Sequence, residues 1–327
     1  MSKVRTLSYA LNHAIQENFC PGESKRSAKF QLQGKTDNKI YSYSHKDSLH
    51  STAKDFANFT KEIFGIRTVY EIDPKHIAAY IEHKAKTCNE KTLLKLSSHL
   101  AKIELCCKYT YSCEKINWDV KEVIIPVSAN NSGITKDKPM DWKTSQTIID
   151  YMTRPGTRSE AYRSLELSRL LGMRVEETVN ARADRFHLEP CRAFPFGYVE
   201  IRKGDGAKGN RPRIIPIQTK EQLESLKTIC AGRVGNDFII QKSRIGNQPL
   251  CKKSVSKSFN RALKELGLEK YNGNLNHALR KDWAQRSYDM YRENHTKNES
   301  VRYVNQILGH GEERSLSELS HYVNNIW

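Results

Sequence analysis

Residues 172–177 spell Gly-Met-Arg-Val-Glu-Glu, in which an arginine and a glutamate lie three positions apart on a segment of helical character. Three further polar stretches follow: Lys-Gly-Asn-Arg-Pro-Arg-Ile-Ile-Pro at 208–216, His-Ala-Leu-Arg at 277–280 and Leu-Gly-His at 308–310, with a tyrosine at 322. Taken singly, each has an ordinary structural explanation. An Arg–Glu pair on a helix surface contributes roughly 0.3 kcal/mol, and a glycine after a helix is a common cap. Their number and order therefore carry the information.

The chain around these stretches is predicted to be mainly helical, with one β-hairpin. Residues 196–202 and 213–217 are predicted as two strands, joined by the turn-rich residues 203–210. The fold class predicted for this half is mainly α with a small β-hairpin or sheet. The other predicted helices of this half cover residues 141–152, 158–171, 174–181, 220–230, 252–267, 277–292, 300–308 and 315–325.

The first half shows helical periodicity, and a linker separates it from the second. An amphipathic helix is predicted over residues 1–20, a basic loop over 22–45 and a set of helices over 46–111. Residues 128–140, rich in Ser, Asn, Gly and Lys, are the predicted linker. The predicted domains are an N-terminal helical domain over 1–130, of which 1–45 is considered as an arm, and a second domain over 141–327.

The chain carries an excess of positive charge in both halves. Fifty-four Lys and Arg oppose 37 Asp and Glu, which gives a net charge of +17. Residues 1–135 hold 20 basic against 14 acidic residues, and residues 136–327 hold 34 against 23. This balance favours a polyanionic partner such as nucleic acid, because binding releases counterions.

Several classes of protein are not expected. No run approaches the ~18 apolar residues of a membrane span, and no apolar core follows the first basic residues, so we expect no signal peptide and a location in the cytosol or nucleoid. The eight cysteines form no Cys-x-x-Cys pair and are predicted to be structural thiols. We expect neither a metal nor a cofactor.

Together and in this order, the four stretches resemble those of the tyrosine recombinase (phage integrase) family. The catalytic half of that family presents Arg, Lys, His-x-x-Arg, His and Tyr in this order, and its boxes are similar to residues 172–177, 277–280 and 308–310. Its hairpin lysine lies eight residues before a proline, as Lys208 lies before Pro216. The resemblance implies a catalytic domain of this family in the second half of the chain.

The resemblance covers residues 170–327 by motif and residues 1–135 by architecture only. It implies a two-domain, C-shaped clamp, in which a helical core-binding domain and the catalytic domain enclose duplex DNA. The chain departs from the family in two places. Residues 292–299 are predicted as an inserted loop, and 12 positions separate His310 from Tyr322.

The resemblance and the chemistry of phosphodiester cleavage assign roles to side chains. A guanidinium group binds two phosphate oxygens at once through parallel hydrogen bonds. An imidazole can accept and donate a proton near neutral pH, and a tyrosine hydroxyl can form a covalent ester with phosphorus. Tyr322 is preferred to Tyr303 as the nucleophile, and His277 either relays a proton or holds that tyrosine. Lys208 is preferred to Lys203 as the donor of a proton to the leaving 5′ oxygen. The predicted catalytic residues are Arg174, Lys208, His277, Arg280, His310 and Tyr322, with Glu177 orienting a cationic neighbour.

We therefore predict a site-specific DNA recombinase, the integrase of a bacterial mobile element or prophage. It would form a 3′-phosphotyrosyl intermediate without metal or ATP and act as a homotetramer on two duplex sites, with accessory DNA-bending or excision factors considered as further partners. Two alternatives stay open: a type IB topoisomerase-like relaxing enzyme, and a non-catalytic DNA-binding protein on the same fold. The helix over 1–20 is assigned to an arm site of the DNA, to a neighbouring protomer or to the N-terminal bundle, and the tail over 323–327 to a neighbouring protomer or to the core of its own domain.

Overall fold

The chain folds into two compact units, Met1–Ile134 and Thr135–Trp327. The computed structural model describes residues 6–23, 25–33, 37–113, 115–126, 139–157, 159–207, 211–242, 246–271, 275–310 and 319–323. Residues 128–138 of the predicted linker lie outside this description. Among the described segments, no helix is both long enough and apolar enough to cross a membrane.

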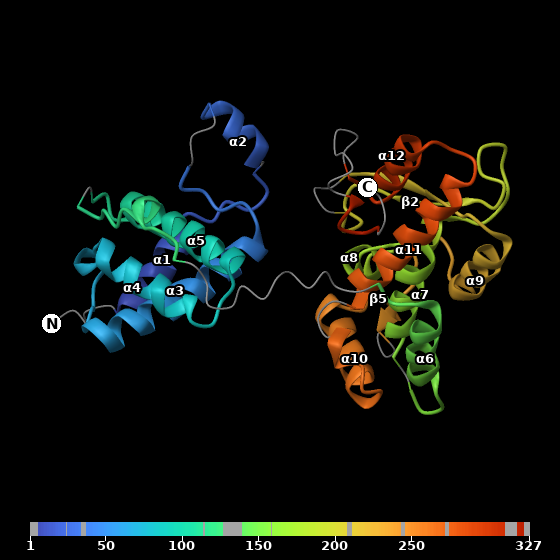
Figure 1. Ribbon diagram of the computed structural model, residues 1–327, viewed down its shortest axis with the longest axis horizontal. Helices are drawn as coiled ribbons and strands as arrows, with labels where there is room; N and C mark the ends of the chain where they lie inside the picture. Colours follow the sequence, from blue (N-terminus) through green and yellow to red (C-terminus); the bar gives the residue numbers. More distant parts are fainter. Residues whose placement is uncertain are drawn as a thin grey trace. The chain divides into compact units, whose positions relative to one another are not determined.

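The N-terminal unit is a bundle of α-helices (Figure 1). It contains α1 (Leu7–Glu17), α3 (Tyr43–Phe64), α4 (Pro74–Ala85) and α5 (Glu90–Thr110), with short 3₁₀ helices at Val69–Glu71 and Val120–Glu122. Helix α1 packs against α3 and α5. The apolar stripes of these helices meet in a core that includes Leu11, Ile15, Phe56, Ile77, Tyr80, Leu100, Ile103 and Trp118.

One prediction for this unit is wrong in part. The basic loop expected over 22–45 contains a helix, α2 (Lys25–Gln31). Its sequence, Lys-Arg-Ser-Ala-Lys-Phe-Gln, consists mostly of residues with good helix propensity. The loop prediction rests on the polar, basic composition of residues 22–45 and on Pro21-Gly22, which end the preceding helix.

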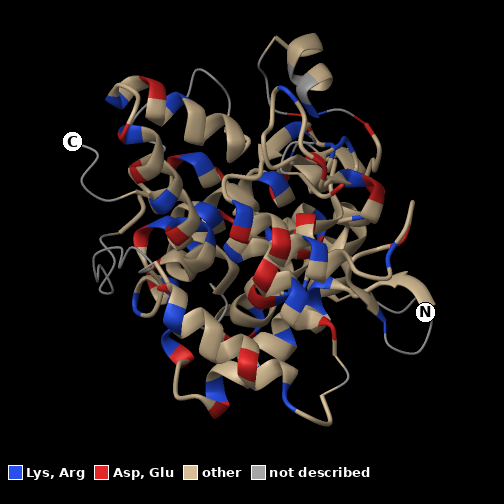
Figure 2. Ribbon diagram, turned by 90° about the vertical axis from the view of Figure 1, so that its right-hand side faces the viewer, with Lys and Arg blue, Asp and Glu red and all other residues tan. Residues whose placement is uncertain are grey.

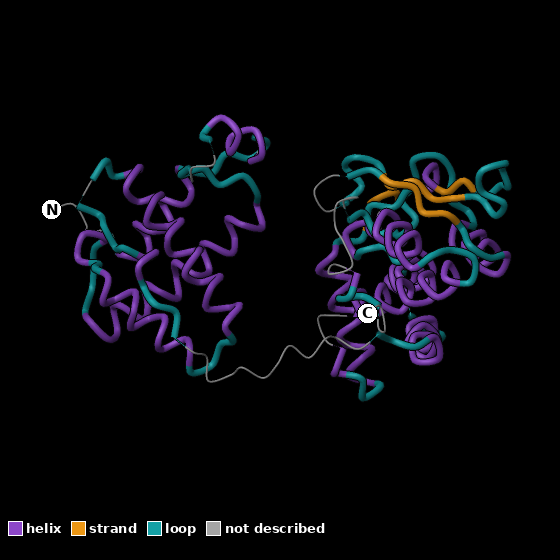
Figure 3. Tube along the Cα trace, turned by 45° about the horizontal axis from the view of Figure 1, so that its top comes forward, coloured by secondary structure: helices purple, strands orange, loops and turns teal. Residues whose placement is uncertain are grey.

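The C-terminal unit holds a small antiparallel sheet covered by helices (Figure 3). Strands β1 (Phe186–His187), β2 (Tyr198–Ile201) and β3 (Arg213–Pro216) lie side by side in that order. The predicted hairpin is confirmed as β2 and β3. A second hairpin, β4 (Gln241–Lys242) and β5 (Gly246–Pro249), was not predicted, because its largely exposed strands lack an apolar alternation.

The described residues of this unit form seven α-helices, whose apolar side chains build two cores. Helix α7 contributes to both, since Leu167 belongs to the core that covers the sheet and Leu165 to the core shared with α10. Lys and Arg positions are interspersed with Asp and Glu positions along the helices (Figure 2). The helices are α6 (Trp142–Thr153), α7 (Ala161–Leu171), α8 (Val175–Val179), α9 (Lys220–Cys230), α10 (Lys252–Glu265), α11 (Leu275–Arg292) and α12 (Lys297–Ile307).

The end of the chain differs from the prediction between α11 and α12. The inserted loop expected over 292–299 is wrong, because α11 runs to Arg292 and α12 begins at Lys297, which leaves only a short turn. Thr296 and Glu299 cap α12 reciprocally, and this pair of residues already signals a helix start. Of the helix predicted over 315–325, only residues 319–323 lie inside the described part; Leu319 is helical and residues 320–322 form a turn.

Candidate active site

The first predicted stretch lies where α7 gives way to α8, and a glycine fixes its path. Gly172 ends α7 with a φ of +62°, and a Cβ atom there would lie 2.5 Å from Cε3 of Trp283. Only glycine satisfies both the backbone angle and this close approach. Arg174 is thereby placed at the start of α8, where its backbone N–H donates to Oε2 of Glu177 (2.8 Å) and its Nη1 donates to Oε1 (3.1 Å).

A second arginine shares that carboxylate from β3. Arg213 donates from Nη1 to Oε1 of Glu177 (2.8 Å) and from Nη2 to Oε2 (2.7 Å). Glu177 is fully buried. Burial alone would raise the pKa of Glu177, but the hydrogen bonds and charge of Arg213, followed by the charge of Arg280, lower it to about 2. Glu177 is therefore an anion at neutral pH and joins α8 to β3.

Arg280, on α11, is the buried centre of the site. Its side chain donates from Nη1 to the carbonyl of Gly172 and from Nη2 to the carbonyl of Leu308, and so ties α11 to the ends of α7 and α12. The residue is only 2% exposed, and within the described chain its Nε–H has no acceptor. Burial, followed by the charges of Arg174 and Arg213, lowers the pKa of Arg280. A guanidinium nevertheless stays protonated at neutral pH.

Tyr322 lies beside Arg280 and between two histidines. Its ring centroid is 5.3 Å from that of His277, near edge-to-face, and 5.2 Å from that of His310. The guanidinium carbon of Arg280 lies 5.8 Å from the centroid of the same ring. The half-buried tyrosine belongs to a short turn that is anchored in the core by the buried side chain of Leu319.

Each histidine is placed by a helix. His277 precedes Arg280 by three residues on α11, which puts the two side chains on one helix face. His310 follows α12, and its backbone N–H donates to the carbonyl of Asn305 (2.9 Å) while its Nδ1 lies 3.1 Å from Oδ1 of the same residue. Gly309, with a φ of +70°, makes the turn between helix and histidine.

The structure brings six of the seven predicted site residues into one connected cluster. The seventh, Lys208, lies outside the described residues, and Lys203 is exposed in the turn after β2. Tyr303, the other tyrosine considered as nucleophile, packs its ring 3.7 Å from that of Tyr291. The clustered residues are Arg174, Glu177, His277, Arg280, His310 and Tyr322.

Sequence reasoning missed one member of the cluster, Arg213. A signal for it exists, because side chains in a strand alternate between two faces. Arg213 shares its face with Ile215 and Ile217, both of which are buried. A charged residue on an apolar strand face requires a buried partner of opposite charge, and here that partner is Glu177.

Sequence comparison identifies the family. The profile of the phage integrase family matches residues 138–325, which are more than half of the chain and include every residue of the cluster. This chain belongs to the phage integrase family. A comparison with curated proteins finds no match. The predicted family is confirmed, and with it the prediction that this integrase-family chain is a tyrosine recombinase, an enzyme that recombines DNA at specific sites.

Solved structures share the fold of this integrase-family chain at low sequence identity. The XerH site-specific recombinase bound to a palindromic difH substrate matches with a TM-score of 0.59 at 15% identity, covering 97% of this chain and 90% of that one. A lambda integrase tetramer bound to a Holliday junction matches with a TM-score of 0.56 at 17% identity, covering 99% and 79%. The Tn1549 transposon integrase in complex with a circular intermediate DNA matches with 0.53 at 11%, covering 97% and 94%. The predicted fold class is confirmed.

Proposed function

We propose that this recombinase cuts and rejoins DNA through a covalent bond between Tyr322 and a 3′ phosphate. The observation that supports the proposal is the meeting of Tyr322 with His277 and Arg280 from α11 and with His310, which follows α12. A nucleophile that attacks a phosphodiester needs groups beside it that bind the anion and move protons. These three neighbours supply both.

The arginines would stabilise the charge that builds on the phosphate oxygens. The side chain of Arg174 is 22% exposed and can reach a bound strand, whereas Arg280 supplies a fixed positive charge from the buried side. Both are held before the substrate arrives, because their partners are protein atoms. Removing one preorganised donor of this kind costs about 10²–10³ in rate.

The proposed step exchanges one phosphodiester for another. Oη of Tyr322 attacks the phosphorus, the bond between phosphorus and the 5′ oxygen breaks, and the phenolic proton passes to His277. Lys208 donates a proton to the leaving 5′ oxygen, with Lys203 as the alternative donor. Because the tyrosyl ester keeps the energy of the broken bond, a second 5′-hydroxyl can reverse the step without ATP.

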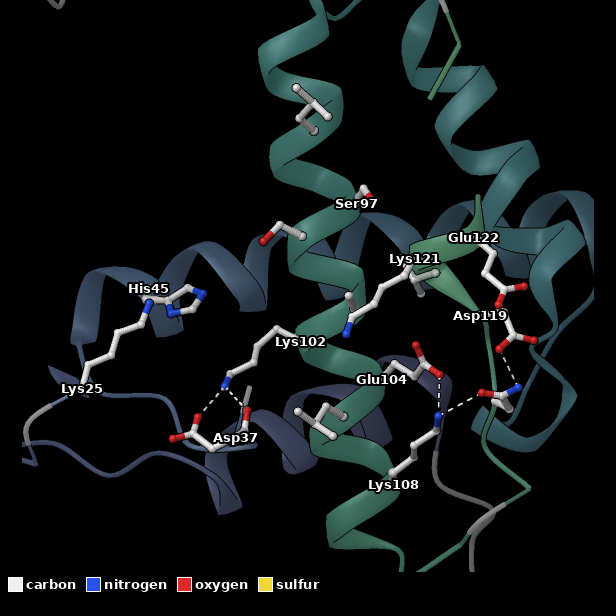
Figure 4. A pocket seen from close by; sticks show the side chains of 16 residues that line it. Lys25, Asp37, His45, Ser97, Lys102, Glu104, Lys108, Asp119, Lys121 and Glu122 are labelled. Carbon is white, nitrogen blue, oxygen red and sulfur yellow. Dashed lines mark hydrogen bonds and ion pairs between the residues drawn. The ribbon is translucent and has the colours of Figure 1, made fainter. Parts of the chain in front are cut away.

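The N-terminal unit would serve as the core-binding domain that the sequence predicts over residues 1–130. A groove of about 1140 Å³ runs along α5 and is lined by lysines and carboxylates (Figure 4). Two of its lysines have carboxylate partners, Lys102 with Asp37 and Lys108 with Glu104. Lys121 makes no ion pair within the described part of the chain and can take a backbone phosphate. Such contacts position a duplex and do not read its sequence.

Assembly and setting complete the proposal. The lambda integrase structure holds a tetramer on a Holliday junction, and the Tn1549 integrase is a transposon protein bound to a circular intermediate. We extend these properties to the present chain: a homotetramer on two duplex sites, encoded by a mobile element, acting in the cytoplasm on nucleoid DNA. The linker over 128–140 would join the two halves of the clamp, and DNA-bending or excision factors would assist.

The decisive experiment traps the covalent intermediate. The full chain is incubated with a library of supercoiled plasmids that carry random inserts, in EDTA and without ATP, and quenched with detergent. Plasmids that stay attached to protein are recovered and sequenced, which also yields the target site. Wild type should form the adduct, and Tyr322→Phe should form less than about 10⁻³ as much while its DNA affinity stays within a few-fold.

Tyr303→Phe is the matched control, because it removes a tyrosine hydroxyl outside the cluster, and it should form the adduct normally. An adduct from Tyr322→Phe would refute the assignment of the nucleophile. Relaxation of every plasmid with no enrichment of a sequence would instead support the topoisomerase-like alternative. DNA binding without any adduct from wild type would support the non-catalytic alternative.

A further inference from the structure

Arg213 has no role in the proposed chemistry, yet it makes two of the four hydrogen bonds to Glu177. Its two terminal nitrogens meet the two carboxylate oxygens at 2.8 and 2.7 Å, the fork-to-fork geometry of a strong Arg–carboxylate pair. Arg174 reaches the same carboxylate with its backbone N–H and with a single guanidinium nitrogen at 3.1 Å. Arg213 therefore clamps Glu177 with both terminal nitrogens of its guanidinium, whereas Arg174 commits only one guanidinium nitrogen to it.

This division leaves donors on Arg174 for a substrate. A guanidinium has five N–H groups, and among the residues described only Nη1 of Arg174 engages a protein acceptor. The side chain of Arg174 is 22% exposed, whereas that of Arg213 is 5% exposed. Arg213 is thus too buried to meet DNA from its present position.

Arg213 also supports the turn that presents His310. A Cβ atom added at Gly309 would lie 3.2 Å from both Cδ and Nη1 of Arg213. The turn therefore rests directly on the arginine side chain, and no larger residue fits between them without movement. Through this contact Arg213 joins β3 and α8 to the histidine that follows α12.

We infer that Arg213 is a positioning residue of the recombinase reaction: it clamps Glu177 so that Arg174 stays available to the phosphate, and it carries the turn of His310. The inference rests on the proposed function, which assigns Arg174 to the scissile phosphate. The charged groups that face Glu177 are Arg174 from α8, Arg213 from β3 and Arg280 from α11. Without Arg213, the buried carboxylate would take both terminal nitrogens of Arg174 and withdraw them from the substrate.

The kinetic test uses single-turnover adduct formation on a duplex that carries the sequence captured from the plasmid library. We expect Arg213→Met to slow the adduct step about 100-fold while the Kd for the duplex changes less than about three-fold. Arg213→Lys, which keeps the charge but not the fork, should slow it about ten-fold. Combining Arg213→Met with Glu177→Gln should restore at least about five-fold over Arg213→Met alone, because a neutral amide holds Arg174 less tightly.

Arg233→Met is the matched control, because Arg233 donates to Glu160 at 2.6 Å in the same unit but outside the cluster. It should leave the adduct rate within about three-fold of wild type. Equal losses in Arg233→Met and Arg213→Met, or losses that simply add in the double variant, would overturn the inference. Should Arg213→Met fail to fold, Arg213→Lys carries the same test through its rate at unchanged Kd.

A crystal structure of the DNA-free Arg213→Lys or Arg213→Met variant separates this inference from the proposed function. The inference predicts that both terminal nitrogens of Arg174 turn onto Glu177. An Arg174 that keeps its single Nη1 contact would overturn the clamp even if wild type forms the adduct. Absence of the adduct in wild type would refute the proposed function, and the crystal structure would still decide whether Arg213 sets the position of Arg174.

Discussion

Two acid–base clusters, one in each unit, use opposite charges differently. In the groove of the N-terminal unit, Glu104 meets Lys108 at 2.8 Å, and the lysine side chain is 34% exposed. In the C-terminal unit, Glu177 is fully buried and is shared by Arg174 and Arg213. A lysine is a mobile point charge near water, whereas an arginine fork fixes direction as well as charge. The first cluster lines a solvent-exposed groove. The second fixes the relative positions of α8 and β3.

The largest difference is expected when one cation is removed from each cluster. Arg213→Met leaves a buried carboxylate short of its main partner and should lower the free energy of unfolding of the C-terminal unit by about 3–5 kcal/mol. Lys108→Met should cost the N-terminal unit roughly 0–1 kcal/mol, because its pair is partly hydrated. Urea unfolding followed by hydrogen exchange in α8 and α5 measures each unit separately. Similar losses in the two units would break the comparison.

The contribution of Glu177 to the free energy of unfolding should fall at acid pH. The pKa of its carboxyl is about 2 in the folded chain, below its ordinary value of 4.5. The ionised group therefore stabilises the fold above about pH 4.5, on the order of 3 kcal/mol at neutral pH, and this contribution is lost as the pH falls toward 2. The difference in unfolding free energy between wild type and Glu177→Gln should shrink from pH 7 to pH 3. A difference that stays constant over this range would contradict the depressed pKa.

Two glycines that end helices give the smallest expected difference. Gly172 and Gly65 have φ values of +62° and +69°, but only a Cβ atom at Gly172 would meet a neighbour, the ring of Trp283 at 2.5 Å. Gly65→Ala should cost about 1 kcal/mol for the backbone angle alone. Gly172→Ala should cost about 2 kcal/mol more because it overpacks the core. Thermal unfolding of both variants checks this prediction. Equal shifts in Tm would mean that the side chains around Trp283 move to accommodate the added methyl group.

Much of the fold and most of the site could be predicted from the sequence, because both depend on local patterns. The alternation in β2 and β3 and the order of the polar stretches are visible without coordinates. The stretches at 172–177, 277–280 and 308–310 specify which side chains must meet, although the sequence does not show their distances.

The rest depends on contacts between distant segments or on weak patterns. The role of Arg213 depends on its hydrogen bonds with Glu177, which lies 36 positions earlier in the sequence. A contact between segments so far apart is not visible in a local pattern. Helix α2 spans only seven residues, which is too short for a helical periodicity to show in the sequence. Hairpin β4–β5 was missed because its strands have no apolar alternation; Gln241 and Asn247 instead form hydrogen bonds with Glu160 and Phe238.

The two carbonyl contacts of Arg280 have a consequence for how the enzyme is made. They reach Gly172, 108 positions earlier in the chain, and Leu308, 28 positions later. A ribosome therefore releases the first partner long before the arginine and the second well after it, and Tyr322 emerges later still. A nascent chain already displays basic side chains that attract nucleic acid. The proposed nucleophile, Tyr322, is added only after Arg280 and both of its carbonyl partners have been synthesised.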